Sequence, residues 1–94
     1  MRIIGRLPDA RMQITIFEND GRFPVQFELA GLTQIYRFRK GDRLGNLGEL
    51  RAYVDESFRS SVLRQFEAMQ HTQAEVLRRI QPAEDPYGDL PEII

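Results

Sequence analysis

The sequence contains no cysteine, no tryptophan and no long run of apolar residues. Without cysteine there can be no disulfide bond, thiolate nucleophile or cysteine metal site. No stretch approaches the roughly 18 apolar residues that cross a bilayer, and the first residues show no apolar run of signal-peptide length. We therefore expect a soluble, cytoplasmic protein that has no membrane partner.

Histidine occurs once, as His71, and this scarcity limits the catalytic chemistry available. Glu67 and Glu75 lie one helical turn on either side of His71, where the three could bind a metal ion weakly, but a solvated, salt-bridged helix face is the commoner arrangement. Residues 41–48, "GDRLGNLG", are rich in glycine but lack the lysine and serine of a phosphate-binding loop. We expect no enzymatic activity, no cofactor and no metal.

The positive charge of this chain is carried almost entirely by arginine, because lysine occurs once, at Lys40, among 13 basic residues. Residues 1–51 have a net charge of plus three, and residues 52–94 have a net charge of minus four. Arginine suits stacking on bases and two-pronged contacts with phosphate. The coding bias of a GC-rich genome would produce the same composition, so both interpretations stay open.

A chain of 94 residues is sized for one globular domain. We place this domain at residues 1–80 and expect an acidic, proline-rich and flexible tail at 81–94. The tail also holds apolar side chains that could serve as anchors, namely Tyr87, Leu90, Ile93 and Ile94.

Apolar and polar residues alternate almost without a break through residues 15–38, which is typical of strands with one buried face. Asp20-Gly21 favours a two-residue hairpin turn, and Ala30-Gly31 would close a second one. Both turns place the apolar residues of neighbouring strands on one face, except that Gln34 indicates a bulge or a hydrogen-bonded buried amide. A third loop at 8–11 would pair Leu7 with Met12. The sequence thus predicts a four-stranded antiparallel meander with strands at about 2–7, 12–19, 22–30 and 32–40.

The second half of the chain is helical in pattern. Asn46 followed by Glu49 has the form of a capping box before a helix over 47–54, and Asp55 can cap a longer helix over 56–80. Apolar residues at near-helical spacing suit packing on the apolar sheet face, which gives an α+β fold of the type ββββα. At 1.5 Å per residue the long helix would run about 37 Å, so its far end must overhang the sheet, break, or meet another chain.

The opposite sheet face is unusually rich in arginine and large apolar groups. It would display Arg2, Ile4, Arg6, Gln13, Thr15, Phe17, Gln26, Glu28, Thr33, Ile35, Arg37 and Arg39. Arginines around an aromatic ring are what a platform for single-stranded DNA or RNA requires. Ile4, Phe17 and Ile35 could equally form the centre of a protein interface, and an ordinary solvated sheet face is the third interpretation. The candidate binding residues are Arg6, Phe17, Arg22, Ile35, Arg37 and Arg39.

The stretch "FENDGRFPVQFEL" at 17–29 resembles the second and third strands of a PUR repeat, the purine-rich-element-binding family. The matching residues are Glu18, Asn19, Gly21, Arg22 and Phe23. The order of four strands before a helix containing "LGELRAYVDE" is also similar, over residues 1–80. The chain departs from the family pattern in having no basic residue within the turn and in having Pro24 after the phenylalanine.

The resemblance implies that single-stranded nucleic acid binds on the sheet and that dimers form through helix exchange. The chain also looks similar to small bacterial domains of unassigned function. The overlong helix, the apolar side chains on the outer sheet face and the anchors in the tail also predict a homodimer. We therefore expect a non-enzymatic binding domain, either a single-strand binder or, alternatively, a homodimeric protein-interaction module with no nucleic-acid role.

Overall fold

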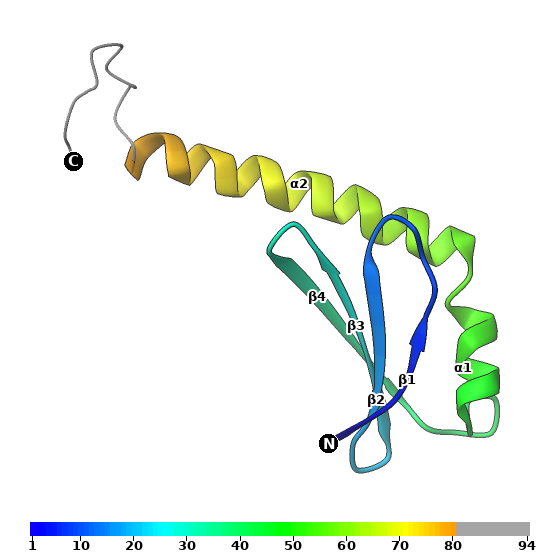
Figure 1. Ribbon diagram of the computed structural model, residues 1–94. Helices are drawn as coiled ribbons and strands as arrows, with labels where there is room; N and C mark the ends of the chain where they lie inside the picture. The colour runs from blue at the N-terminus through cyan, green and yellow to red at the C-terminus, as the bar shows by residue number, and fades with distance from the viewer. Residues whose placement is uncertain (81–94) are drawn as a thin grey trace, which may run out of the picture.

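The computed structural model describes residues 1–80, and the tail expected at 81–94 lies outside them. Its elements are the strands β1 (Arg2–Leu7), β2 (Gln13–Glu18), β3 (Arg22–Leu29) and β4 (Leu32–Arg39), then the helices α1 (Leu47–Tyr53) and α2 (Glu56–Ile80). The strands form one antiparallel sheet in the order β1-β2-β3-β4, and both helices lie on the same side of it (Figure 1). The predicted α+β meander is confirmed.

Both predicted hairpin turns form. Asp20 and Gly21 have φ angles of 53° and 79°, and Ala30 and Gly31 have 52° and 80°. Two successive positive φ angles are the signature of the type I′ turn, whose twist matches that of the flanking strands. The registers follow from these turns, so that Val25 lies opposite Ile16 on one side and opposite Tyr36 on the other.

The predicted register of β1 is wrong by two residues. Leu7 pairs with Ile14 and not with Met12, which is buried in the loop before β2. The loop is longer because the Asp9 carboxylate accepts a hydrogen bond of 2.8 Å from the backbone N–H of Arg11 and holds a local turn there.

An irregularity between Ile3 and Gly5 changes which side chains of β1 face outward. Ile3 pairs with Phe17 and is 49% exposed, whereas Ile4 packs against the core. Arg2 pairs with Glu18, and its guanidinium lies 2.7 Å from that carboxylate. The predictions that Arg2 and Ile4 lie on the face away from the core are therefore wrong.

The hydrophobic core fills the space between one sheet face and the two helices. Its buried members are Leu7, Met12, Ile14, Ile16, Phe23, Val25, Phe27, Leu50, Val54, Val62 and Phe66. Both helix starts are capped as predicted, because Asn46 accepts a hydrogen bond from the Glu49 N–H and Asp55 accepts one from the Phe58 N–H, each at 2.9 Å. The Glu49 carboxylate reaches the N–H of Gly45, one residue before the cap.

Gln34 is a buried amide whose hydrogen bonds are satisfied, which is one of the two predicted outcomes. Its Nε2 donates to the Val62 carbonyl oxygen at 2.9 Å, and its Oε1 accepts from the Tyr36 hydroxyl. The ladder continues through the Phe27 and Gln34 pair without a bulge. Gln34 thereby connects β4 to the backbone of α2.

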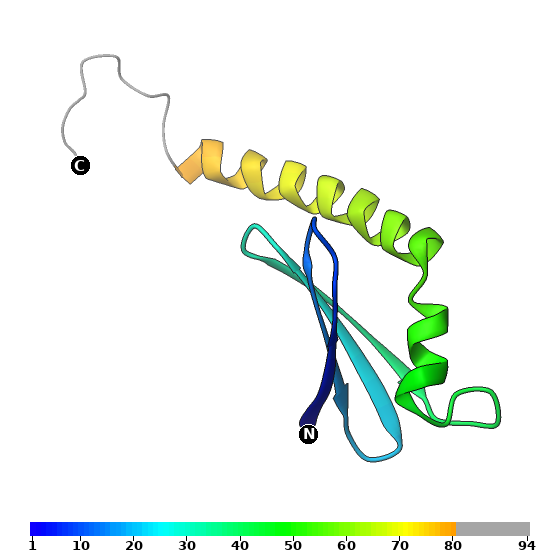
Figure 2. The ribbon, with the colours of Figure 1, turned by 45° about the vertical axis from the view of Figure 1, so that its right-hand side comes forward.

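Helix α2 is unbroken and overhangs the sheet. At 1.5 Å per residue its 25 residues span about 37 Å, and Figures 1 and 2 show it extending past the turn between β3 and β4. Val62 and Phe66 are buried, whereas every residue from Gln70 to Ile80 is exposed. Neither helix within residues 1–80 has both the length and the apolar character needed to span a membrane.

Candidate nucleic-acid interface

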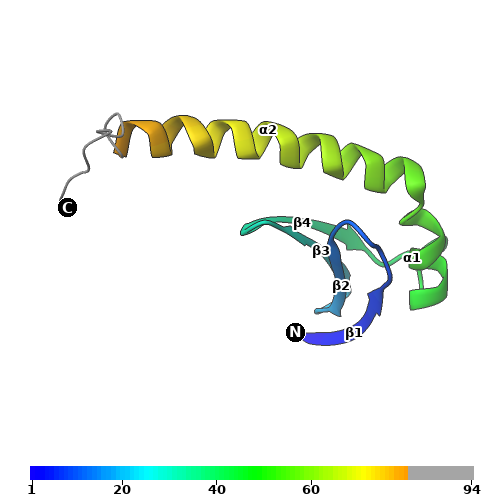
Figure 3. The same cartoon turned by 45° about the horizontal axis from the view of Figure 1, so that its top comes forward.

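The candidate residues lie on the sheet face that neither α1 nor α2 covers, which we call the open face. Figure 3 shows the sheet curling, with both helices on its other side. Alternation along the strands sends the core residues to the helices and their neighbours to the open face. The open face therefore receives all six predicted site residues: Arg6 from β1, Phe17 from β2, Arg22 from β3, and Ile35, Arg37 and Arg39 from β4.

Three of these arginines form a cluster at one end of β3 and β4. Arg22 lies directly opposite Arg39, and Arg37, two residues before Arg39, lies opposite Pro24. Cβ atoms of directly opposed residues are about 4.5 to 5.5 Å apart. All three arginine side chains are exposed. We call Arg22, Arg37 and Arg39 the arginine cluster.

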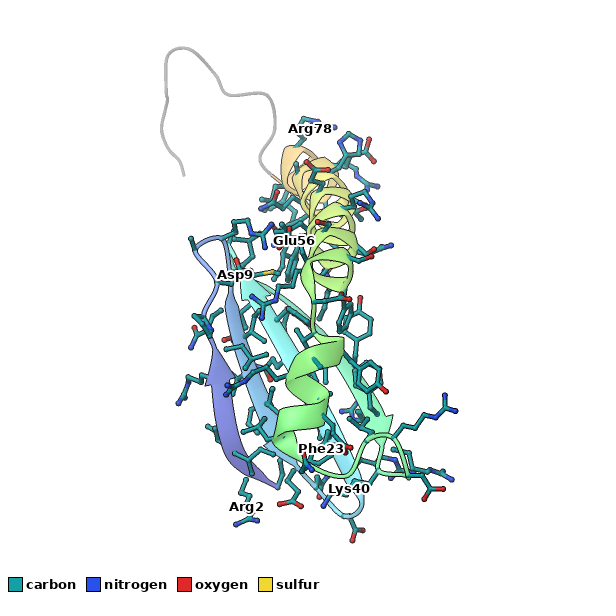
Figure 4. The ribbon with its side chains drawn as sticks, turned by 90° about the vertical axis from the view of Figure 1, so that its right-hand side faces the viewer. Arg2, Asp9, Phe23, Lys40, Glu56 and Arg78 are labelled. Carbon is teal, nitrogen blue, oxygen red and sulfur yellow. The ribbon has the colours of Figure 1, made fainter. Side chains whose placement is uncertain are left out.

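No carboxylate within residues 1–80 forms an ion pair with the arginine cluster. The ion-paired cations of this part of the chain are Arg2, Arg11, Lys40, Arg59 and Arg78. Glu18, the carboxylate next to Phe17 in sequence, binds Lys40 and Arg2, and these hydrogen bonds lower its pKa to about 2. Figure 4 shows Arg2 and Lys40 close together at the lower end of the sheet, beside Phe23. Glu18 is thus charged at neutral pH, and Arg2 and Lys40 already neutralise it.

An apolar row lies beside the cluster. Phe17 pairs with Ile3, and the register that sets Ile16 against Val25 and Asn19 against Arg22 places Phe17 opposite Pro24. Pro24 is buried and Phe17 is half-buried, so the sheet covers part of the Phe17 ring. The row Ile3, Phe17, Pro24 and Arg37 crosses the whole sheet, and Phe17 lies two strands, roughly 10 Å, from Arg37.

The remaining two predicted residues lie farther away. Arg6 and Ile35 occupy the two ends of the neighbouring row, separated by Thr15 and Gln26 on the strands between them. Ile35 is 43% exposed and extends the apolar surface along β4. Arg6 sits on the opposite edge, so the structure groups Phe17 with the arginine cluster and leaves Arg6 outside that group.

Two open-face residues were missed by the sequence analysis, Ile3 and Pro24. Pro24 could have been found, because the register predicted from the Asp20-Gly21 turn already sets it against Phe17. Ile3 could not, because its orientation depends on the irregularity in β1, which no local pattern indicates.

An apolar groove lies on the helix side, at the corner between α1, α2 and β4. Its volume is about 500 Å³, and it is lined by Tyr36, Phe38, Arg43, Leu44, Leu50, Tyr53, Val54 and Phe58. Phe58 packs edge-on against the rings of Tyr36 and Phe38, with centroids 5.2 and 6.1 Å away. No sequence pattern indicates this groove, because its walls come from three elements and a loop.

Residues 1–80 bring no set of metal-binding side chains together. His71 is exposed on α2, and no group of three or more His, Asp or Glu side chains in the described part of the chain is arranged to bind a metal ion. The absence of enzymatic activity and of a cofactor stays a prediction.

In comparisons with protein-family models, curated protein sequences and solved structures, the chain matches none of them. The resemblance to a PUR repeat therefore stays a hypothesis.

Proposed function

We propose that the open face binds single-stranded DNA or RNA, with the arginine cluster holding phosphates and Phe17 stacking on a base. The observation that carries this proposal is the pairing of Arg22 with Arg39, beside Arg37, with no carboxylate of residues 1–80 bound to any of the three. Like charges placed directly opposite one another destabilise a sheet. A polyanion laid across them removes that repulsion and gains charge-assisted hydrogen bonds.

The charge distribution supports an anionic ligand. Residues 1–80 contain all 13 basic residues and ten of the 14 acidic ones, which gives them a net charge of plus three. The overall charge of minus one arises because residues 81–94 hold the other four acidic residues and no basic one. The overall charge therefore understates the attraction of residues 1–80 for a polyanion.

The site chemistry favours single strands over duplexes. The open face offers the flat, half-buried ring of Phe17. Arg37, the arginine of the same row, lies roughly 10 Å away. Unpaired bases can stack on such a ring while the backbone follows the basic edge, with site sizes of roughly 4 to 16 nucleotides in comparable platforms. Neither α1 nor α2 lies on this face, so no helix of residues 1–80 is placed there to enter a major groove.

Fluorescence anisotropy with labelled purine-rich and pyrimidine-rich strands of about 12 nucleotides tests this function. Three or four phosphate contacts predict that affinity falls roughly 20-fold to 50-fold between about 50 and 200 mM salt. The double variant Arg37→Ser/Arg39→Ser should bind at least about tenfold more weakly and show a shallower salt dependence. Arg78→Ser/Arg79→Ser removes the same charge from the far end of α2 and is the matched control. Equal losses in both double variants would leave only nonspecific charge attraction and would contradict the site.

A homodimeric interaction module is the second candidate, and one observation favours it. Beyond the sheet, α2 exposes Val76, Leu77 and Ile80 by 42%, 45% and 66%. They continue the stripe that buries Val62 and Phe66 nearer the start of the helix. Sedimentation equilibrium at micromolar concentration tests this candidate, and a monomer at all concentrations would exclude it.

A further inference from the structure

We propose that the apolar groove between α1, α2 and β4 binds residues 84–92 of a second copy of the chain. Tyr87 and Leu90 fill the groove, and the acidic residues between and beside them face Arg43. This interaction lies on the helix side and does not depend on nucleic-acid binding by the open face.

Residues 1–80 cover this part of the core incompletely. Leu50 and Val54 at its base are buried, but Tyr36, Phe38, Leu44 and Phe58 are only half-buried, and Tyr53 is 54% exposed. Its volume of about 500 Å³ is within the range of pockets that bind apolar groups. Aromatic walls of this kind favour an aromatic anchor, since ring pairs gain from edge-to-face contact.

The charge at the groove fits the sequence of the segment. Arg43 is the one charged residue among those lining the groove, and within residues 1–80 it makes no ion pair. Arg43 also lines the neighbouring hollow, together with Asp42 and Glu49, so attraction for an acidic segment rests on Arg43 and is opposed by these two carboxylates. The segment reads "EDPYGDLPE", with Asp89 between the two apolar anchors and no basic residue.

The path of α2 directs the segment to a second copy. From Phe58 at the groove to Ile80, the helix runs 22 residues, or roughly 33 Å. The ten residues that lead from Ile80 to Leu90 span at most about 33 to 36 Å. Leu90 of the same copy could therefore reach Phe58 only at full extension, and Tyr87 could not reach it. Figure 2 shows the end of α2 pointing away from the corner where α1 meets α2.

Paramagnetic relaxation in a mixed sample tests the proposal, and the lack of native cysteine makes the labelling simple. One population of the full chain carries Ala83→Cys with a nitroxide label, and the other is ¹⁵N-labelled without nitroxide. We expect signal loss at the amides of Leu44, Leu50 and Tyr53 in the ¹⁵N-labelled copies. No signal loss, or loss confined to the open-face strands, would overturn the proposal.

A charge exchange measured by sedimentation equilibrium gives a second, independent test. Arg43→Glu and Asp89→Arg should each weaken dimerisation several-fold, and the double variant should recover to within about threefold of the original chain. Tyr87→Ser/Leu90→Ser should weaken it by at least about tenfold. If Leu77→Ser dissociates the dimer while Tyr87→Ser/Leu90→Ser leaves it intact, the interface is the α2 stripe and the proposal is wrong.

Discussion

Arg22 and Arg39 face each other directly across β3 and β4, on the open face of the sheet. Neither is paired with a carboxylate of residues 1–80. Cross-strand pairs of like charge oppose strand association, so this end of the sheet stores an unfavourable interaction while no ligand is bound. An arrangement that opposes folding and suits phosphate is typical of a binding surface rather than of a structural one.

Arg39→Ser should therefore stabilise the unliganded protein. Removing one of two opposed charges is expected to raise the free energy of unfolding by about 0.2 to 1 kcal/mol at low salt. The gain should shrink at high salt, because exposed charges are screened. Urea denaturation at two salt concentrations measures both effects. Arg79→Ser on α2 serves as the control, and an equal gain there would show that overall charge is responsible.

Phe17→Leu separates the stacking of a base on the Phe17 ring from the packing of this side chain in the sheet. Leucine keeps an apolar side chain against Ile3 and Pro24, so the free energy of unfolding should change by less than about 1.5 kcal/mol. Loss of the ring should weaken binding of single strands by about 1 to 3 kcal/mol if a base stacks there. Anisotropy and thermal melting of the same preparation give both values. Unchanged affinity would show that Phe17 belongs to the sheet and takes no part in recognition.

The Gln34 amide is expected to be the most sensitive polar group between β4 and α2. Gln34→Ala leaves the Val62 carbonyl and the Tyr36 hydroxyl without their partner, which should cost about 1 to 3 kcal/mol of stability. Tyr36→Phe should cost about 0.5 to 1.5 kcal/mol, since it removes only one hydrogen bond. Chemical denaturation checks both variants. Gln70→Ala, exposed on α2, should change stability by less than about 0.5 kcal/mol.

Acid should weaken the contact between the β1–β2 loop and α2. Asp9 accepts hydrogen bonds from Arg11 and Arg59, its side chain is 2% exposed, and the Arg11 hydrogen bonds hold its pKa well below the usual range. Figure 4 shows Asp9 facing the start of α2 near Glu56. Because folding lowers this pKa, its contribution is complete above the unfolded value of about 4 and is lost as pH falls below it.

The measurement is the free energy of unfolding as a function of pH. Stability should decline from about pH 5 toward pH 2, and Asp9→Asn should flatten part of that decline. The remaining slope belongs to Glu18 and Glu56, whose pKa values are also lowered by their cationic partners. At neutral pH, Asp9→Asn should cost about 1 to 3 kcal/mol, because Arg11 and Arg59 lose a charged acceptor whose own side chain is 2% exposed. An unchanged slope in this variant would remove Asp9 from the explanation.

Local turn chemistry explains why most of the sheet could be predicted. A positive φ at two successive residues is required at Asp20-Gly21 and at Ala30-Gly31, and each turn fixes one register. The β1 register could not be predicted, because the loop after Leu7 is shaped by Asp9 and by its bond to Arg59, fifty residues later in the chain.

The positions of the candidate site residues could be predicted wherever a hairpin turn fixes the register. Phe17 and the arginine cluster follow from the registers that the two turns fix, so they were placed correctly. The sequence predicted Ile4 on the open face, but the structure has Ile3 there, because one irregular residue in β1 reverses the faces of its neighbours. The groove at Phe58 was not predictable, since it depends on how the two helices meet the edge of the sheet.

The most direct test of the proposed function is a methyl NMR titration with a single strand of about 12 nucleotides. Isoleucine reports both sides of the sheet, because Ile3 and Ile35 lie on the open face while Ile14 and Ile16 are buried against the helices. The account predicts that the Ile3 and Ile35 methyl signals shift with saturation at low salt and return when salt is raised, while Ile14 and Ile16 stay in place. No shift at Ile3 and Ile35, or shifts only at Ile80 on α2, would contradict it.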